Sequence, residues 1–572
     1  MTGPTAWNSL PAMMLDLARR EPGAPMLRYW RQGAWHRMDR AAFAKAVAAT
    51  AAGLRAKGVS PGDRVVIVAP NRPEILIADT AIMAIGAVTV PTYTTNTVAD
   101  HAHILGDSGA RAVIAADAAT AAKLREAAGE GGLDLVVVMD GEAPEGAVAW
   151  AEVASTEAGL AMLMAEADEI PSGRLACLIY TSGTGGKPKG VMLPHRSMLA
   201  NREGIRDIIE RLHLKGQPYL SFLPLSHAYE HTVCFLLPSH GMEVVFSRGA
   251  DKVAGEFREI EPAIITAVPR IFEVLRARIE GEIAKAKPLQ RRLFEKTLEL
   301  GLKRLDGRLG LLEKLQDMVL ERLVRPKIRD RFGSRLAAIV SGGARLDPAL
   351  SGYFLALGVP VLQGYGQTEA GPVISVNLPW DNHRRTVGPP LPGVELVIAP
   401  DGEVLVRGPL VMDGYWNQPD ATATALRPLD GEAGGEPWLH TGDMGVLEEG
   451  RLRITDRKKD FIKTLGGEMV SPAKVESLLM AEPAIAQAVV AGEGEPALSG
   501  LIVPADGYDA EAVTAALRKV NARLSPPERV RRHAIVPAFT QDNGMLTPTM
   551  KVKRRVVLEA HAGVLEGLKR QG

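Results

Sequence analysis

The chain has 572 residues, of which 46% are hydrophobic and 23% charged, and its 67 lysine and arginine residues balance 67 aspartate and glutamate residues. This length exceeds one compact core, so two or more domains are expected, and a net charge near zero gives no reason to propose nucleic acid as a partner. The amino-terminal residues lack the basic-then-apolar order of a signal peptide, and the most apolar region, residues 75–90, is shorter than a bilayer span. With only two cysteines, Cys177 and Cys234, these features predict a soluble cytoplasmic protein.

Apolar strand-like runs alternate with helix-like patterns through most of the first 390 residues. Buried strands are predicted at residues 63–69, 111–116, 133–140, 175–180, 263–269, 336–343 and 359–366. The stretch PEILIADTAIMAIGA, between the first two, is typical of a helix. This alternation predicts an α/β fold with largely parallel sheets.

Between residues 271 and 331 the pattern becomes helical and highly charged. Leu312, Leu315, Val319 and Leu323 recur at a spacing of three or four residues. The simplest interpretation is a set of solvated helices on the outside of the domain. A peripheral membrane surface or an oligomer surface is the alternative.

The pattern changes twice more toward the carboxyl terminus. From about residue 392, short strand-like runs broken by Gly, Pro and Asp predict a small β-rich subdomain. After residue 456 a charged run, DRKKDFIK, leads into a compact pattern of helices and strands. We place the boundary at 455–460, which gives a large domain of residues 1–455 and a small α+β domain of residues 456–572.

The glycine-rich stretch YTSGTGGKPKGV, residues 180–191, follows a predicted buried strand. Glycines let backbone N–H groups turn toward an anion, hydroxyls add donors, and lysines add positive charge. The stretch is not a Walker A loop, because Lys187 is followed by Pro188 and Lys189 by Gly190. We therefore expect a polyphosphate-binding loop of another type.

Four further stretches are glycine-rich or polar, and the first two of them end strand-like runs, where α/β folds place ligands. They are SGGARL (341–346), GYGQTEAG (364–371), WLHTGD (438–443) and, near the end, LTPTMKVKRR (546–555). Taken singly, they could be turns, a solvated carboxylate and an exposed basic patch. Together, and in this order, they resemble the motifs of the adenylate-forming superfamily of acyl-CoA synthetases, luciferases and peptide-synthetase adenylation domains.

Within that superfamily, the chain resembles the long-chain fatty-acid–CoA ligase branch. The similar stretches are FLPLSHAYEH (222–231), TAVPRIFE (266–273) and NGMLTPTMKVKR (543–554). The resemblance implies an enzyme that activates a long- or medium-chain fatty acid with ATP, releases pyrophosphate, and transfers the acyl group to CoA. A fatty acyl-AMP ligase that delivers to a carrier protein, an aryl or branched-acid CoA ligase, and a non-catalytic acyl-adenylate-binding protein remain alternatives.

The resemblance also implies the roles of individual residues in the large domain. The triphosphate would be held by Thr181, Ser182, Gly183, Thr184, Gly185, Gly186, Lys187 and Lys189, with Gly185 where threonine is more usual. The nucleotide base would lie against Gly343, Ala344, Gly364 and Tyr365, and Gly366 and Gln367 would also belong to the nucleotide site. Thr368 would contact the α-phosphate and Glu369 would bind Mg²⁺, while His227, Tyr229 and His231 would lie near the acyl entrance.

In the last part of the chain, Asp443 would accept the ribose hydroxyls with support from Arg457, and Lys551 would be the adenylation lysine. Lys459 corresponds to the family's hinge, about which the small domain rotates to admit CoA. Lys463, Gly466 and Gly467 would then face pantetheine. The expected ligands are thus ATP, Mg²⁺, CoA and a fatty acid, and a homodimer and a peripheral membrane contact are left open.

Overall fold

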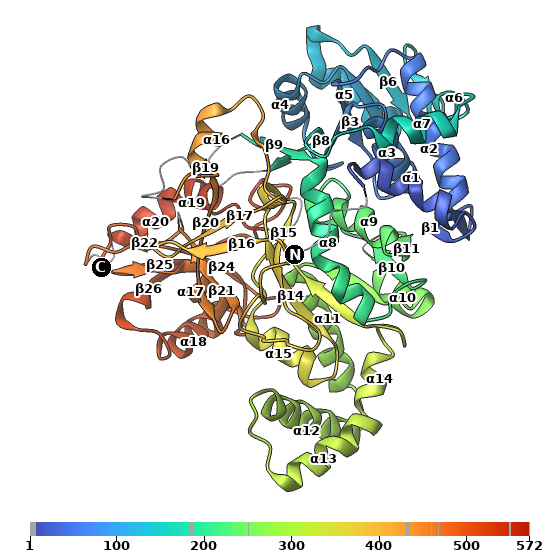
Figure 1. Cartoon of the computed structure of the whole chain (residues 1–572). Helices are drawn as coiled ribbons and strands as arrows, with labels where there is room; N and C mark the ends of the chain where they lie inside the picture. Colours follow the sequence, from blue (N-terminus) through green and yellow to red (C-terminus); the bar gives the residue numbers. More distant parts are fainter. Residues whose placement is uncertain are drawn as a thin grey trace. The chain divides into compact units, whose positions relative to one another are not determined.

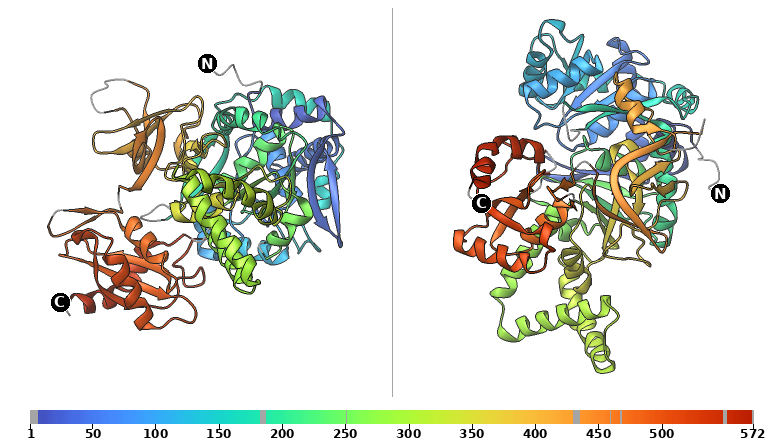
Figure 2. Two further views of the ribbon diagram at one scale, coloured as in Figure 1. Left: turned by 90° about the horizontal axis from the view of Figure 1, so that it is seen from below. Right: turned by 90° about the vertical axis from the view of Figure 1, so that its left-hand side faces the viewer.

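The computed structural model describes residues 7–181, 187–249, 251–429, 435–458, 460–466, 468–547 and 551–570 (Figures 1 and 2). The chain divides into two compact units. The first consists of Met1–Thr181, Pro188–Leu396 and Val406–Leu439, and the second of Ser182–Lys187, Val397–Leu405 and His440–Gly572.

The first unit contains two eight-stranded sheets. One has the order β18-β9-β8-β4-β3-β5-β6-β7, in which the strands from β8 to β7 run parallel and β9 and β18 are antiparallel additions. The bounds are β3 (Arg64–Val68), β4 (Val88–Pro91), β5 (Ala112–Ala115), β6 (Leu135–Val138), β7 (Val148–Ala149), β8 (Leu175–Thr181), β9 (Lys189–Pro194) and β18 (Gly414–Tyr415). The central strands are continuous apolar runs because both faces of a parallel sheet are covered.

The second sheet of this unit has the order β15-β14-β13-β12-β10-β11-β1-β2. Its middle is parallel, and antiparallel pairs close both ends. The bounds are β1 (Pro25–Arg31), β2 (Ala34–Asp39), β10 (Pro218–Ser221), β11 (Glu243–Phe246), β12 (Ile264–Ala267), β13 (Ala338–Ser341), β14 (Val361–Gly366) and β15 (Val373–Val376). The α/β prediction is confirmed: in these two sheets, as far as the structure describes them, the antiparallel strands lie at the edges.

Helices cover these sheets according to their apolar residues. Every residue of α3 (Pro73–Ala84) is buried, as expected of a helix that is apolar on all sides. The other helices that pack within this unit are α1 (Leu10–Arg20), α2 (Arg40–Ala56), α4 (Val98–Ser108), α5 (Ala118–Ala128), α6 (Trp150–Ala154), α7 (Leu160–Asp168), α8 (His195–Arg211), α9 (Ala228–Ser239), α10 (Val253–Ile260), α15 (Pro348–Ala356) and α16 (Pro419–Ala425).

The charged region predicted to be helical forms four helices. They are α11 (Pro269–Ala284), α12 (Pro288–Leu305), α13 (Leu311–Leu323) and α14 (Arg325–Arg329), and α12 and α13 run side by side (Figures 1 and 2). Among the described residues, no helix combines the length and the apolar character needed to cross a bilayer.

The predicted β-rich region is a five-stranded sheet with the order β16-β17-β20-β19 and with β21 paired to β20. Its strands are β16 (Glu395–Ile398), β17 (Glu403–Arg407), β19 (Leu426–Arg427), β20 (Trp438–Glu448) and β21 (Arg451–Arg457). The second unit also contains β22 (Ile462–Lys463), β23 (Met469–Val470), α17 (Pro472–Met480), β24 (Ile485–Ala491), β25 (Leu498–Pro504), α18 (Ala510–Asn521), β26 (Val530–Ile535), α19 (Arg554–Ala560) and α20 (Ala562–Lys569). Val475, Leu479 and Ile502 belong to its apolar core, which is why the predicted helix–strand pattern folds here.

Candidate active site

The two ends of the predicted phosphate loop are fixed by the β8–β9 hairpin. Thr181, at the end of β8, pairs directly with Lys189 at the start of β9. The carbonyl of Pro188 accepts a hydrogen bond from His103 Nε2 at 2.7 Å, and Tyr180 donates its hydroxyl to Asp107 at 2.6 Å. Helix α4, which carries both partners, thus anchors the base of the loop.

The loop itself is described only at its ends. Residues 182–186, which include Ser182, Gly183, Thr184, Gly185 and Gly186, lie outside the described residues, as do Lys459 and Gly467. Lys187 is exposed.

Glu369 and Lys189 both contact Tyr415, a residue that was not predicted from the sequence. Tyr415, on β18, donates its hydroxyl to Glu369 Oε1 at 2.9 Å, and Lys189 Nζ lies 4.8 Å from the centre of the Tyr415 ring. Burial and the neighbouring Glu369 carboxylate raise the pKa of Tyr415, so its hydroxyl remains a donor. The only sequence signal for Tyr415 is an aromatic pair in the turn-rich stretch GYWN.

The Glu369 carboxylate has the character of a magnesium ligand. It is half-buried, Tyr415 occupies Oε1, and no residue that the structure describes donates a hydrogen bond to Oε2. Mg²⁺ prefers oxygen ligands and is commonly held by one or two carboxylates together with substrate phosphates and water. The residues present therefore fit this ion.

The glycines of GYGQTEAG serve the close approach of two strands. A Cβ atom on Gly366 would lie 1.8 Å from the carbonyl oxygen of Pro372, so no other residue fits there. On Gly364 a Cβ would lie 3.3 Å from the Ser375 carbonyl. This close antiparallel pairing of β14 and β15 leads directly into the short turn η2 (Thr368–Ala370), which carries Thr368 and Glu369. Tyr365 and Gln367 flank Gly366 and are half-buried.

Tyr229 lies beside the predicted adenine site. Its hydroxyl donates to the Val340 carbonyl at 3.1 Å, and a Cβ on Gly342 would lie 2.9 Å from its ring. Gly343 follows with φ +77°, and Ala344 after it is exposed. Tyr229, predicted at the acyl entrance, and Gly343, predicted at the adenine site, thus lie close together at the end of β13.

The two histidines predicted near the acyl entrance have visible structural roles. His227 caps α9, since its Nδ1 accepts a hydrogen bond from the Tyr229 N–H at 3.2 Å. His231 is fully buried and its Nε2 lies 2.6 Å from Asp79 Oδ2. Neither contact requires a ligand.

In the second unit, Asp443 and Arg457 are partners on paired strands. Asp443 on β20 lies opposite Arg457 on β21, with Arg457 Nε 3.3 Å from Asp443 Oδ1. Glu403, which the sequence did not single out, accepts hydrogen bonds from the Gly442 N–H at 2.9 Å and from Lys458 Nζ at 2.8 Å. Burial opposes ionisation of Glu403, yet these hydrogen bonds hold its pKa below the usual range. Glu403 therefore supports the turn before Asp443.

Lys551 is positioned by its backbone. Its N–H donates to Thr547 Oγ1 at 3.0 Å, and its carbonyl accepts from the Thr547 N–H at 2.8 Å. Three residues on, Arg554 donates to both oxygens of Glu476 and to the Val490 carbonyl at 2.8 Å. Arg554 is thus an anchor of the Lys551 segment rather than a free surface cation.

The predicted CoA-facing residues lie around the β22–β23 hairpin. The backbone of Lys463 bonds to Glu493 and Gly494, and its side chain is exposed. A Cβ on Gly466 would meet only the flexible end of Glu468, 2.4 Å away, so packing alone does not demand glycine there.

Comparisons with known proteins agree with these motifs. The sequence profile described as "AMP-binding enzyme" matches residues 15–416, and that described as "AMP-binding enzyme C-terminal domain" matches residues 459–571. The chain is 35% identical over 505 residues to the long-chain-fatty-acid–CoA ligase FadD15 of Mycobacterium tuberculosis, covering 86% of this chain and 82% of that protein. It is 32% identical over 490 residues to the long-chain-fatty-acid–CoA ligase 1 of Cavia porcellus, covering 80% and 67%.

Solved structures share the fold at lower identity. The o-succinylbenzoate CoA synthetase of Bacillus subtilis, in complex with its acyl-adenylate intermediate, superposes with a TM-score of 0.70 at 23% identity, covering 95% of this chain and 97% of that one. The adenylation domain of a carboxylate reductase from Mycobacterium chelonae gives 0.71 at 21% identity, covering 100% and 92%. Profile, relatives and fold confirm the resemblance: the chain belongs to the AMP-binding enzyme family.

Proposed function

We propose that the protein is a long-chain fatty-acid–CoA ligase. The likeness to proteins of that name over most of both chains carries the proposal. The reaction has two steps: the fatty-acid carboxylate attacks the α-phosphorus of ATP and pyrophosphate leaves, and then the CoA thiol attacks the acyl carbon, loses its proton, and AMP leaves.

The first step joins an anionic carboxylate to an anionic phosphate, so neutralisation of charge is its main requirement. Lys189 and the loop after Thr181 would hold the β- and γ-phosphates, and Thr368 would contact the α-phosphate. A magnesium ion on Glu369 would neutralise phosphate charge. The link through Tyr415 supports this assignment, because it places the lysine and the carboxylate around one ring.

Residues of the second unit would complete the reaction. Asp443 would accept the ribose hydroxyls, with Arg457 in support, and Lys551 would bridge the carboxylate and the α-phosphate. An ammonium group suits that task because it is a compact charge on a flexible stem. For the second step we keep Lys459 as the hinge and Lys463, Gly466 and Gly467 as the pantetheine contacts.

The extent of the two domains is a proposal as well. We place the boundary at 455–460, and the match of the C-terminal-domain profile from residue 459 supports that position. A cytoplasmic location and a homodimer are retained as proposals.

The test is ATP-dependent formation of acyl-CoA from carboxylic acids of increasing chain length. Each buried methylene contributes about 0.8 kcal/mol, so an apolar acyl site should favour long tails strongly over acetate. Acids of neighbouring length should differ much less than long tails differ from acetate, because one methylene discriminates by about 1–3 kcal/mol whereas the contributions of many methylenes add up. Failure to activate any carboxylate would overturn the proposal and favour a non-catalytic acyl-adenylate-binding protein.

Two alternative enzymes predict different products. A fatty acyl-AMP ligase would release pyrophosphate without CoA and form no thioester with it, so pyrophosphate and thioester are measured with and without CoA. An aryl or branched-acid CoA ligase would prefer those acids in a substrate panel.

A further inference from the structure

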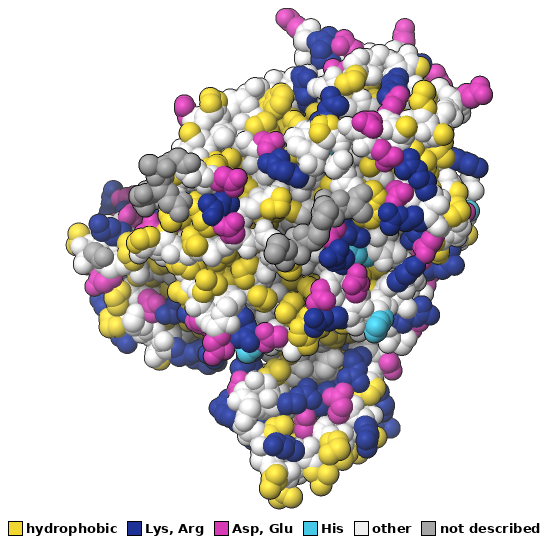
Figure 3. Space-filling view, in the orientation of Figure 1, with side chains coloured by type: hydrophobic (Ala, Val, Ile, Leu, Met, Phe, Trp, Pro, Cys, Tyr) yellow, Lys and Arg dark blue, Asp and Glu magenta, His cyan; other side chains and the backbone are white. Residues whose placement is uncertain are grey.

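Helix α13 presents its apolar side chains to solvent. Leu311, Leu312, Leu315, Met318, Val319 and Leu323 are between 49% and 87% exposed. Their spacing of three and four residues places them along one side of the helix, which we call the α13 face. Figure 3 shows hydrophobic side chains gathered at the lower end of the α12–α13 pair.

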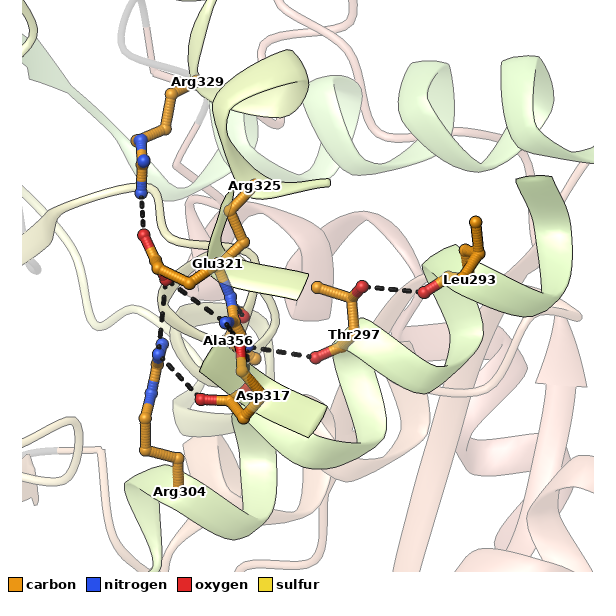
Figure 4. A network of polar contacts seen from close by, with 8 residues as sticks. All are labelled: Leu293, Thr297, Arg304, Asp317, Glu321, Arg325, Arg329 and Ala356. Atoms are coloured by element: carbon orange, nitrogen blue, oxygen red, sulfur yellow. Dashed lines mark hydrogen bonds and ion pairs between the residues drawn. The ribbon is translucent and has the colours of Figure 1, made fainter. Parts of the chain in front are cut away.

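The acidic side chains of the same helix point the other way, into the protein. Glu313 pairs with Lys303 at 2.7 Å, and Glu321 pairs with Arg329 at 2.7 Å. Asp317 is buried and bonds to Arg325, whose side chain is fully buried (Figure 4).

This arrangement reverses the usual amphipathic helix, in which the apolar face packs on the core. Turning α13 to bury its leucines would break the ion pairs and leave Arg325 buried without a carboxylate, which is costly. The acidic pairs therefore fix the outward orientation of the α13 face.

Positive charge surrounds this face. Residues 285–329 contain 13 lysines and arginines against 6 carboxylates, a formal charge of +7, whereas the whole chain has a formal net charge of zero. Lys287, Arg291, Arg292, Lys314 and Arg322 are exposed and pair with no carboxylate that the structure describes. A partner for this surface must offer both an apolar phase and negative charge.

We propose that the α13 face docks on the surface of a phospholipid bilayer that contains anionic lipids. An interfacial helix needs an apolar face bordered by lysine and arginine, and it lies in the plane of the membrane. At 1.5 Å per residue, the 13 residues of α13 span about 20 Å, which suits a helix lying on the surface. Arg322 lies within the face, and its long stem lets the guanidinium reach the headgroups.

A second copy of the chain is the less suitable occupant. Two copies meeting through this face would bring two segments of charge +7 together, at a cost in repulsion. Anionic headgroups would instead neutralise the same charge. The proposal does not depend on the acyl substrate, because docking is measured without catalysis.

The experiment is sedimentation of the full chain with vesicles. One set contains phosphatidylcholine alone and the other also contains about 30% phosphatidylglycerol. We expect binding to the anionic vesicles that weakens at least about tenfold in high salt or on neutral vesicles. Leu312→Gln/Leu315→Gln should weaken binding to anionic vesicles about tenfold or more, since it removes apolar contact without changing charge.

The control is Met162→Gln/Met480→Gln, which removes two side chains that are 62% and 43% exposed on α7 and α17. It should bind vesicles like the unaltered chain. Arg322→Gln/Lys314→Gln should keep weak binding to neutral vesicles but lose the preference for anionic ones. Equal binding by the Leu312→Gln/Leu315→Gln variant and the unaltered chain would overturn the proposal. The proposal would also be overturned if light scattering showed a dimer that dissociates in the Leu312→Gln/Leu315→Gln variant but not in the control variants. A second copy of the chain would then occupy the α13 face.

Discussion

Glu369 in the first unit and Lys551 in the second are held in place in different ways. The Glu369 side chain is bonded to Tyr415 and follows a strand that packs so closely on Pro372 that only glycine fits at position 366. Lys551 is placed by backbone bonds to Thr547 and by the anchored Arg554 three residues later. The proposed metal ligand is thus held through its side-chain carboxylate, whereas the bonds to Thr547 hold the backbone of the proposed adenylation lysine. Substitutions at the two positions should therefore affect different properties of the enzyme: the adenylation half-reaction at Lys551 and the Mg²⁺ requirement at Glu369.

The largest effect is expected at Lys551. Lys551→Ala should slow acyl-adenylate formation about 100- to 1,000-fold, because it removes the charge that bridges the two anions. Thioester formation from supplied acyl-adenylate should change little. The two half-reactions are measured separately, with Lys553→Ala as the neighbouring control. Equal loss of both half-reactions would show that Lys551 is not specific to adenylation.

Glu369→Gln should reduce adenylation about 10- to 100-fold. The amide keeps the shape of the side chain but loses the charge that favours a hard cation. The rate is followed as Mg²⁺ is raised, and the half-saturating concentration should increase. Glu273→Gln, at an exposed position on α11, is the control. An unchanged Mg²⁺ dependence would remove Glu369 from the metal site.

Tyr415→Phe tests whether the link to Glu369 matters. Loss of the hydroxyl should lower adenylation about tenfold and raise the Mg²⁺ requirement, since partners of metal ligands set their orientation. The ring that Lys189 approaches is retained, so ATP affinity should change less. Tyr508→Phe removes a hydroxyl at a position that is 45% exposed and serves as the control. If Tyr415→Phe and Tyr508→Phe have the same adenylation rate and the same Mg²⁺ requirement, the Tyr415 hydroxyl does not orient Glu369.

Much of the fold could be predicted from the sequence because each strand is a short apolar run between turn residues. The motif residues Glu369, Asp443 and Lys551 could be predicted as well, because each lies in a stretch rich in glycine or threonine that resembles a known motif. Tyr415 and Glu403 could not be found that way, because their roles depend on contacts between segments far apart in the chain. The orientation of α13 could not be predicted either. The spacing of its leucines predicts an apolar face, but the ion pairs of Arg325 with Asp317 and Glu321 determine that this face points to solvent.

The smallest expected effect is on the pH dependence of folding stability, and it concerns two buried carboxylates. Glu476 in the second unit has Arg554 as a cationic partner, whereas Glu230 in the first is held by the hydroxyls of Tyr219 and Thr266. Burial raises the pKa of both Glu230 and Glu476 to about 7 from the usual 4.5. Between those values the unfolded chain releases the Glu230 proton and the folded chain keeps it, so the contribution of Glu230 to stability falls as pH rises from about 5 to 7 and then levels off.

At about 1.4 kcal/mol per pH unit, the contribution of Glu230 to this loss should be about 2–3 kcal/mol, and Glu230→Gln should reduce the pH slope by that amount. It is measured as the Tm of the full chain from pH 5 to 8, with the exposed Glu295→Gln as control. What matters is the slope, because the amide also alters the hydrogen bonds and shifts Tm at every pH. A variant that keeps the slope of the unaltered chain would mean that Glu230 is ionised in the fold throughout, so that its hydroxyl and thiol partners, Tyr219 and Thr266 with Cys234, stabilise a buried negative charge.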